Sequence, residues 1–212
     1  MPLFLVACKS KADPLASESM VKRLVRFIKG PIDHVELSFV EEGRETYGLF
    51  ITMHSKTVRF CSRDYSTIDK FYDVEWYELS NVDVLACEKY CADRQGRGIF
   101  SIWPMMRSAM PFDNETVIRA MSDFVETRAV PRAAFDRREV EEETQEFCAS
   151  LTIKALQAGS ELLKDVDPYK CTASDVVRLV LARFGGQLKP RPVFTKPAHA
   201  ESEFVRSEDW YA

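Results

Sequence analysis

Cys148 is the residue in this sequence with the most reactive chemistry available to it. It precedes an apolar-periodic stretch, so we expect it in the first turn of a helix. Backbone N–H groups in that turn have no intrahelical partner, and the positive end of the helix dipole favours a thiolate over a thiol. Because the thiolate is the form that attacks carbonyl carbon, the position predicts a nucleophilic cysteine. The alternative is that Cys148 is a small buried hydrophobic residue.

A thiolate nucleophile needs a partner that handles protons, and the usual partner is an imidazole. The chain has three histidines, and His34 is the best placed of them. It falls on a stretch that alternates in polarity, so we expect His34, Glu36 and Ser38 to share one face of a strand. His199 falls in the tail, where we expect it to be exposed and without a role.

Two other groups of residues have both a functional and a structural interpretation. Cys87 and Cys91 are four residues apart on a predicted helix and could join His34 or Cys61 at a zinc ion, although the spacing favours two buried thiols. Aromatic residues among the strands could line a substrate groove or fill the core, and the core is favoured. These aromatic residues are Tyr72, Trp76 and Tyr77.

Secondary-structure patterning predicts helices and strands in separate parts of the chain. Runs rich in β-branched and aromatic residues, bounded by turn residues, predict a four-stranded antiparallel meander over 32–40, 46–53, 57–61 and 74–79. Helical periodicity predicts helices over 18–29, from 81 to about 95, from 113 to about 128, from 148 to about 164 and over 172–184. Thr172 and Asp175 have the spacing of a capping box at the start of the last helix.

The N-terminal apolar run from Met1 to Cys8 has no preceding basic residue, so it predicts a first strand rather than a signal peptide. The helix that follows is basic. Six basic and two acidic residues lie between Lys9 and Lys29, and the face formed within 22–29 could dock on an anionic membrane or could simply be solvated.

We expect one domain over 1–190, with 97–146 as a lid-like insertion and 191–212 as a partly ordered tail. The insertion is apolar but broken by two prolines at its start, and from Asp136 to Glu146 it holds six acidic and two basic residues. Trp103 lies in its apolar part, which we expect to cover a groove.

Composition excludes several classes of protein. A chain of 212 residues that is 46% hydrophobic can bury a core without disulfides or metal. The 29 basic and 33 acidic residues give a net charge of −4, which argues against binding nucleic acid over the whole surface. Six scattered cysteines without a secretion signal favour free thiols in a reducing, cytoplasmic compartment. No phosphate-loop or dinucleotide motif is present, so no cofactor or metal is expected.

Several short motifs, taken in order, resemble those of a known superfamily. They are the runs at 32–39, 46–48, 63–66 with Tyr72, 147–151 and 172–175. The sequence is similar to the circularly permuted branch of the NlpC-type papain-like superfamily, in which a histidine on an early strand precedes a cysteine at the start of a late helix. That branch includes lecithin:retinol acyltransferase-like enzymes, bacterial lipid or peptide hydrolases, and proteins of large DNA viruses.

The resemblance implies an α+β fold, circularly permuted and papain-like, with an antiparallel sheet packed against the helix that carries Cys148. It implies a hydrolase or acyltransferase that cleaves an amide, ester or thioester bond of a peptide or lipid, with His34 as general base and acid. Tyr47, Gly48 and Trp103 would line the groove. If the protein is viral, the host cytoplasm or the virion is its expected location.

The third polar residue of the family, which orients the histidine, is not at its usual place after Thr46. Thr46, Glu36 and His54 are candidates for this role. Two other functions therefore remain open. One is an idle binding module that retains the groove, and the other is a lipid-surface or membrane-surface protein that uses the basic 22–29 helix. The oligomeric state is not predicted.

Overall fold

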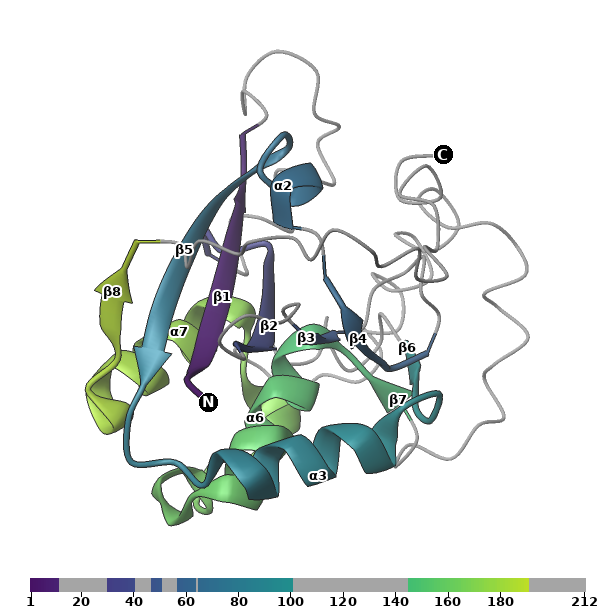
Figure 1. Ribbon diagram of the computed structural model, residues 1–212. Coiled ribbons are helices and arrows are strands. Elements are labelled where there is room, and N and C mark those ends of the chain that lie inside the picture. The colour runs from purple at the N-terminus through teal and green to yellow at the C-terminus, as the bar shows by residue number, and fades with distance from the viewer. Residues whose placement is uncertain (12–29, 41–46, 51–56, 64, 101–144, 191–212) are drawn as a thin grey trace, which may run out of the picture.

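A computed structural model describes residues 1–11, 30–40, 47–50, 57–63, 65–100 and 145–190. The described chain is α+β, with a six-stranded antiparallel sheet in the order β4-β3-β2-β1-β5-β8 (Figure 1). Its strands are β1 (Leu3–Ser10), β2 (His34–Phe39), β3 (Tyr47–Phe50), β4 (Arg59–Ser62), β5 (Tyr72–Leu79) and β8 (Gln187–Lys189). The helices are α2 (Tyr65–Ile68), α3 (Val84–Arg94), α6 (Cys148–Gly159) and α7 (Ala173–Phe184), with 3-10 turns η3 (Glu161–Leu163) and η4 (Pro168–Lys170).

The predicted first strand, β1, is confirmed and lies in the middle of the sheet. It pairs along its length with both β2 and β5. Residues from Leu3 to Cys8 are all buried, because elements cover both faces of this strand, and this explains why the run is apolar without alternation. The predicted four-stranded meander is therefore wrong at its last strand. The strands β2, β3 and β4 do form a meander, but β1 separates them from β5.

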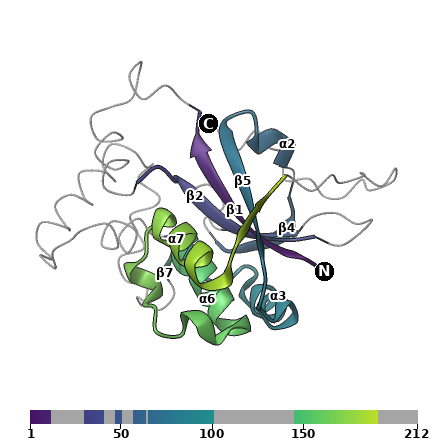
Figure 2. The same cartoon turned by 90° about the vertical axis from the view of Figure 1, so that its left-hand side faces the viewer.

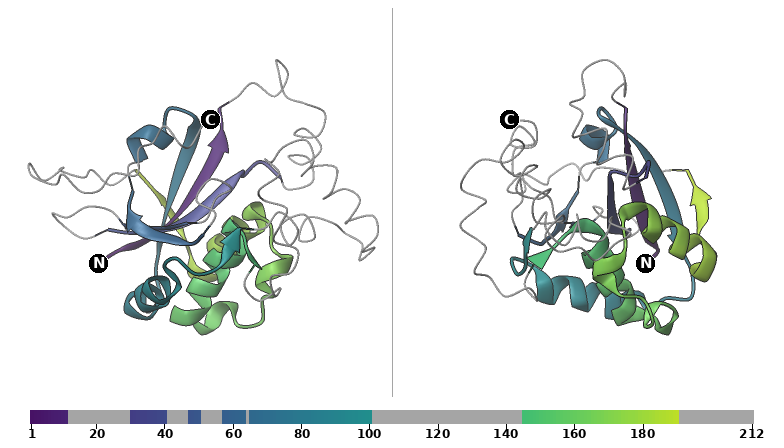
Figure 3. Two further views of the ribbon diagram at one scale, coloured as in Figure 1. Left: turned by 90° about the vertical axis from the view of Figure 1, so that its right-hand side faces the viewer. Right: turned by 180° about the vertical axis from the view of Figure 1, so that it is seen from behind.

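Helices cover the two faces of the sheet unequally. Leu5, Val35 and Leu37 belong to the large core that contains the buried residues of α3, α6 and α7, whereas Phe4 and Val6 pack with Trp76 and the short helix α2 on the other face. Figures 2 and 3 show α3, α6 and α7 together on one side of the sheet and α2 on the opposite side. The antiparallel sheet packed against the helix that begins at Cys148 is thus observed.

The predicted signals for helix ends agree with the structure. Thr172 and Asp175 exchange the hydrogen bonds of a capping box at the start of α7, and Gly185 ends that helix in the left-handed conformation with φ of 59°. The helix α3 has Asp83 as its N-cap, whose side chain accepts from the Ala86 N–H. The helix α6 begins at Cys148 as predicted, but it ends at Gly159, before the turn η3, and is shorter than expected.

The two ends of the predicted insertion lie side by side. The short strands β6 (Ile99–Phe100) and β7 (Gln145–Glu146) pair in parallel, so the chain leaves and returns to the described part of the fold at one place. The helices predicted over 18–29 and from 113 to about 128, the basic 22–29 face and the tail at 191–212 lie outside the described residues. Within the described part of the chain, no helix is long and apolar enough to cross a membrane.

Candidate functional site

Cys148 is the first residue of α6, a helix that packs against the strands β2 and β3. The side chain of its N-cap residue, Phe147, provides no hydrogen-bond acceptor for the helix. The N–H of Phe147 instead donates to the Ser150 Oγ at 3.0 Å, and this bond fixes the turn that presents Cys148. Cys148 is 9% exposed, so it lies at the margin of the core. This position combines partial access with the positive end of a helix dipole.

His34 meets Cys148 where β2 begins. The two side chains lie close enough for Cys148 to raise the pKa of His34 through a hydrogen bond and its charge, although 114 residues separate them in the sequence. His34 is in register with Cys8 on the neighbouring strand β1, and its side chain is 18% exposed. The structure therefore brings together the nucleophile and the imidazole that the sequence predicted, and it places the pair at the junction of the sheet and the N-terminus of α6.

Glu36 is the carboxylate that holds His34. Its Oε2 lies 3.1 Å from the His34 Nε2, and its side chain is completely buried. Both residues are on β2, two positions apart, so they project from the same face of the strand, as predicted. Of the three candidates for the orienting residue, Glu36 is the one that the structure brings to His34. Thr46 and His54 lie outside the described residues.

Arg63, just after β4, completes the polar cluster and was not predicted as a site residue. Its Nε and Nη2 donate to the two oxygens of Glu36 at 3.1 and 3.0 Å, which makes a bidentate ion pair. Its guanidinium also stacks over Phe50, 3.9 Å from the ring centroid. Arg63 belongs to a run that the resemblance singled out, but a charged residue after a short strand is normally read as a surface residue. Its partner is 27 positions away in the sequence.

The charges in this cluster shift the pKa values of its members in opposite directions. Burial alone would lower the pKa of His34, but hydrogen bonds to Cys148 and Glu36, together with their charges, raise it to about 9. Burial alone would raise the pKa of Glu36, but the charge of Arg63 and the hydrogen bond from His34 lower it to about 2. At neutral pH the cluster therefore contains an imidazolium and a carboxylate.

Removing the thiol is expected to lower the pKa of His34. Two of the contributions that raise it, a hydrogen bond and a charge, come from Cys148, so Cys148→Ala leaves only Glu36 to oppose the effect of burial. We expect the His34 ring signals in NMR spectra to titrate near pH 9 in the wild-type protein and at a clearly lower pH in Cys148→Ala. Cys171→Ala, which removes another buried thiol, is the matched control. Equal His34 titration in all three proteins would contradict the contact.

Glu36 is expected to contribute to acid denaturation. Because its pKa is lowered from 4.5 to about 2 in the folded protein, its stabilising effect is complete above about pH 4.5 and is lost as the pH falls through 2. Between those limits, the unfolding free energy of the wild-type protein should fall by about 3 kcal/mol more than that of Glu36→Gln. Urea unfolding at a series of pH values measures this difference, and parallel curves for the two proteins would contradict it.

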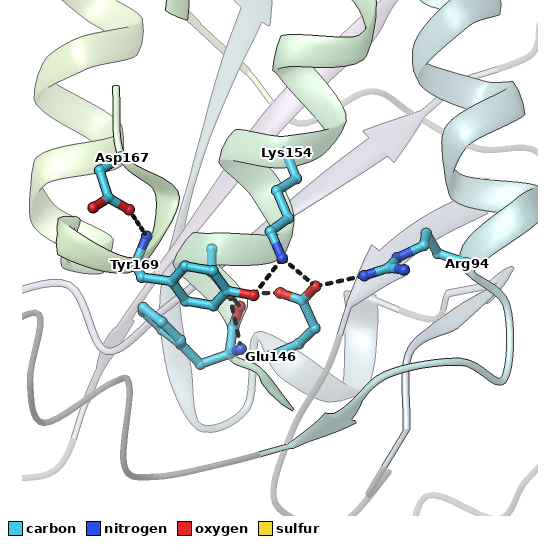
Figure 4. Close-up of polar contacts among 7 residues, drawn as sticks. Arg94, Glu146, Lys154, Asp167 and Tyr169 are labelled. Carbon is cyan, nitrogen blue, oxygen red and sulfur yellow. Dashed lines mark hydrogen bonds and ion pairs between the residues drawn. The ribbon is translucent and has the colours of Figure 1, made fainter. Parts of the chain in front are cut away.

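A second buried carboxylate, Glu146, lies two residues before Cys148. Its Oε1 accepts from Arg94 of α3 at 2.8 Å and from Lys154 of α6 at 2.7 Å (Figure 4). Its Oε2 accepts from the Ser150 hydroxyl at 2.8 Å. Lys154 also contacts the Tyr169 hydroxyl at 2.6 Å. This network joins β7, α3, α6 and η4 around the turn that carries Cys148. The sequence did not reveal it, because Glu146 belongs to the acidic run at the end of the predicted insertion.

The predicted groove residues are placed only in part. Gly48 lies on β3, where an added Cβ would be 3.3 Å from the Arg63 side chain and from the Tyr65 hydroxyl, so the glycine leaves room for the residues that support Glu36. Tyr47 lies on β3 and pairs with Phe39 and Ser62. Trp103 lies outside the described residues. Trp76 and Tyr77 are buried and Tyr72 is partly buried against the core, which agrees with the core interpretation of these aromatic residues.

Within the part of the chain that the structure describes, Cys87 and Cys91 have no further side chains with which to bind zinc. Both thiols are completely buried in the large core, and burial is the main cause that raises their pKa values. In the described ranges, no group of three or more His, Cys, Asp or Glu side chains is arranged to hold a metal ion.

The side chains of the described site determine which chemical steps it can perform. It contains a thiol at a helix N-terminus, an imidazole bonded to it, a carboxylate that holds the imidazole, and an arginine that holds the carboxylate. Such a set can form a thiolate, move one proton and stabilise a negative charge. Comparison with known proteins adds no family: no protein-family model, no curated protein and no solved structure matches this chain.

Proposed function

We propose that the protein is a cysteine hydrolase or acyltransferase that cleaves an amide, ester or thioester bond through a Cys148 acyl-enzyme. The observation that carries this proposal is the cluster of Cys148, His34 and Glu36: Glu36 contacts the His34 Nε2 at 3.1 Å, and Cys148 lies close enough to His34 to raise its pKa. A nucleophile, a base that contacts it and a group that orients the base form the arrangement used in covalent acyl transfer.

The first half of the reaction would form a thioester. The Cys148 thiolate attacks the carbonyl carbon, and the negative charge moves to the carbonyl oxygen, which lies against the first-turn N–H groups of α6. When the tetrahedral intermediate collapses, the bond to the leaving group breaks and the His34 imidazolium gives its proton to that group. Cys148 is then acylated and His34 is neutral. Glu36 stabilises the imidazolium that is present before this step and keeps the ring in place.

The second half would release the acyl group. Neutral His34 takes a proton from water or from another acceptor as that molecule attacks the thioester carbonyl. The bond between carbon and the Cys148 sulfur breaks, and the thiolate beside the imidazolium is restored. The chemistry acts on the carbonyl group alone, so both peptide and lipid acyl groups are possible substrates.

The order of His34 and Cys148 along the fold supports the proposal of a permuted papain-like arrangement. A histidine on an early strand, β2, and a cysteine at the start of a later helix, α6, meet where that helix packs on an antiparallel sheet. We propose this superfamily as the origin of the chain, with one difference from its usual pattern. The orienting carboxylate, Glu36, comes from the same strand as the histidine rather than from the next one.

An acyl-transfer probe tests the proposal without knowledge of the natural substrate. The full chain is treated with p-nitrophenyl acetate, and the acetylated residues are identified by peptide mass spectrometry. We expect one acetyl group on Cys148 at early times, and more than one equivalent of p-nitrophenolate at later times as the thioester hydrolyses. Cys171→Ala should behave as the wild type, and Cys148→Ala should lose both results. Acetylation of Cys61 at the rate of Cys148 would contradict the proposal, because Cys61 is a partly exposed thiol outside the cluster.

A further inference from the structure

The ion pair between Arg63 and Glu36 goes beyond what is needed to orient a histidine. Glu36 is completely buried and Arg63 is 9% exposed, so neither charge is well hydrated. A buried ion pair of this kind is expensive to desolvate, and its bidentate geometry only partly offsets the cost. A polar neutral residue such as Asn at position 36 would be sufficient to hold the His34 ring. The presence of two full charges next to the candidate nucleophile therefore calls for an electrostatic explanation.

Counting charges provides that explanation. Arg63 is positive, Glu36 is negative, the His34 imidazolium is positive and the Cys148 thiolate is negative, so the four side chains together are neutral when the thiolate is formed. Without Arg63, the neutral arrangement has Glu36 and His34 charged and Cys148 as a thiol. Formation of the thiolate would then leave a net negative charge in a buried cluster, which is unfavourable.

The remaining titratable groups near the cluster do not change this count. Burial is the main cause that raises the pKa values of the Cys8 and Cys61 thiols and of the Tyr65 phenol. All three groups are therefore neutral near pH 7. Asp33, which precedes β2 and accepts the Ser10 N–H, is partly exposed to solvent. Among the described residues, Cys8 on β1, Cys61 on β4 and Tyr65 on α2 interact electrostatically with Glu36 and Arg63, whereas Asp33 acts on Cys8.

We propose that Arg63 is a positioning residue that balances the charge of Glu36, so that the neutral state of the cluster is the Cys148 thiolate beside the His34 imidazolium. Arg63 acts through Glu36 and does not touch the acyl group. The bidentate bonds at 3.1 and 3.0 Å fix the carboxylate that faces His34, and the stacking over Phe50 fixes the guanidinium itself. This inference rests on the proposed function, since it explains how the nucleophile is maintained.

The test is the pH dependence of Cys148 alkylation by iodoacetamide, followed by peptide mass spectrometry, in the wild type, Arg63→Met and Arg63→Lys. We expect Arg63→Met to alkylate about tenfold more slowly at pH 6, with its profile shifted to higher pH by about one unit. Arg63→Lys keeps the charge, so its rate of Cys148 alkylation at pH 6 should stay within about threefold of the wild-type rate. If Arg63 served only to pack the fold, its variants would change in stability, but the pH profile of Cys148 alkylation would not shift.

The outcomes separate this inference from the proposed function. If the wild-type thiol itself reacts only near its ordinary pKa, the proposed function fails. If the wild-type thiol is activated and Arg63→Met keeps the same profile, only the role of Arg63 is overturned. Loss of activation in Arg63→Lys as well as in Arg63→Met would also overturn charge balancing, because the charge is retained in Lys. Should Arg63→Met fail to fold, Arg63→Gln, whose amide can still donate to Glu36, replaces it as the neutral variant.

Discussion

His34→Ala is expected to lower the rate of Cys148 acetylation by p-nitrophenyl acetate at pH 7 by about 10²-fold to 10⁴-fold. The imidazole lies close enough to Cys148 for the thiol to raise the pKa of His34, so His34 is the group that we propose to exchange a proton with it. General acid and base catalysis by a positioned side chain contributes rate factors of this size. Glu36→Gln should have a smaller effect, because it keeps the ring in place by a neutral hydrogen bond but removes the charge that stabilises the imidazolium.

Cys8→Ala is the matched control for His34→Ala. Cys8 is in register with His34 across the pair β1 and β2 and is also buried, so its removal disturbs the same part of the sheet. Burial raises the pKa of its thiol, which makes it a poor nucleophile. In the Cys8→Ala protein, we expect the rate of Cys148 acetylation to remain within a few-fold of the wild-type rate. A His34→Ala protein that acetylates Cys148 at the rate of Cys8→Ala would contradict the role of the imidazole.

The double variant Arg94→Met/Lys154→Met is expected to lose at least about 3–5 kcal/mol of unfolding free energy. It leaves Glu146, whose side chain is completely buried, without either of its two cations. Removing the partner of a buried charge costs that much, because the remaining charge is neither hydrated nor paired. The replacement side chains are apolar and of similar length, so lost packing contributes little. Urea unfolding measures the change, and the variant is expected to unfold at a much lower urea concentration.

Two variants make this result specific to the buried carboxylate. Adding Glu146→Gln to the double variant removes the unpaired charge and should restore much of the lost stability. Lys164→Met breaks the ion pair with Glu161, in which both side chains are more than half exposed, and should change stability by no more than about 0.5 kcal/mol. A double variant that is no less stable than Lys164→Met would show that Glu146 does not anchor the turn before Cys148.

The sequence was sufficient to predict the residues whose chemistry is local. Cys148 at a helix start and His34 on an alternating strand are recognisable from types and periodicity, because helix and strand geometry fix where such side chains point. The capping box at Thr172 and Asp175 is also a local signal, and it was confirmed. Alternation further placed Glu36 on the face of His34.

The parts that could not be predicted depend on pairings between distant segments. Arg63 and Glu36 are 27 positions apart, and Arg94 and Glu146 are 52 positions apart, so no periodicity links them. The position of β1 between β2 and β5 also depends on pairing between segments that are far apart in the sequence. Because β5 pairs with β1 rather than with β4, the simple meander fails. The sequence could not show which of several polar residues would meet the histidine for the same reason.

The proposed chemistry depends most on a single property, the activation of Cys148 by His34. The measurement that tests it directly is the rate of Cys148 alkylation by iodoacetamide between pH 4 and 10, in the wild type and in His34→Ala. We expect half-maximal reactivity of the wild-type thiol well below the ordinary pKa of about 8.5, and a shift to that value or above when His34 is removed. Identical profiles in the two proteins, both at or above the ordinary pKa, would contradict the account.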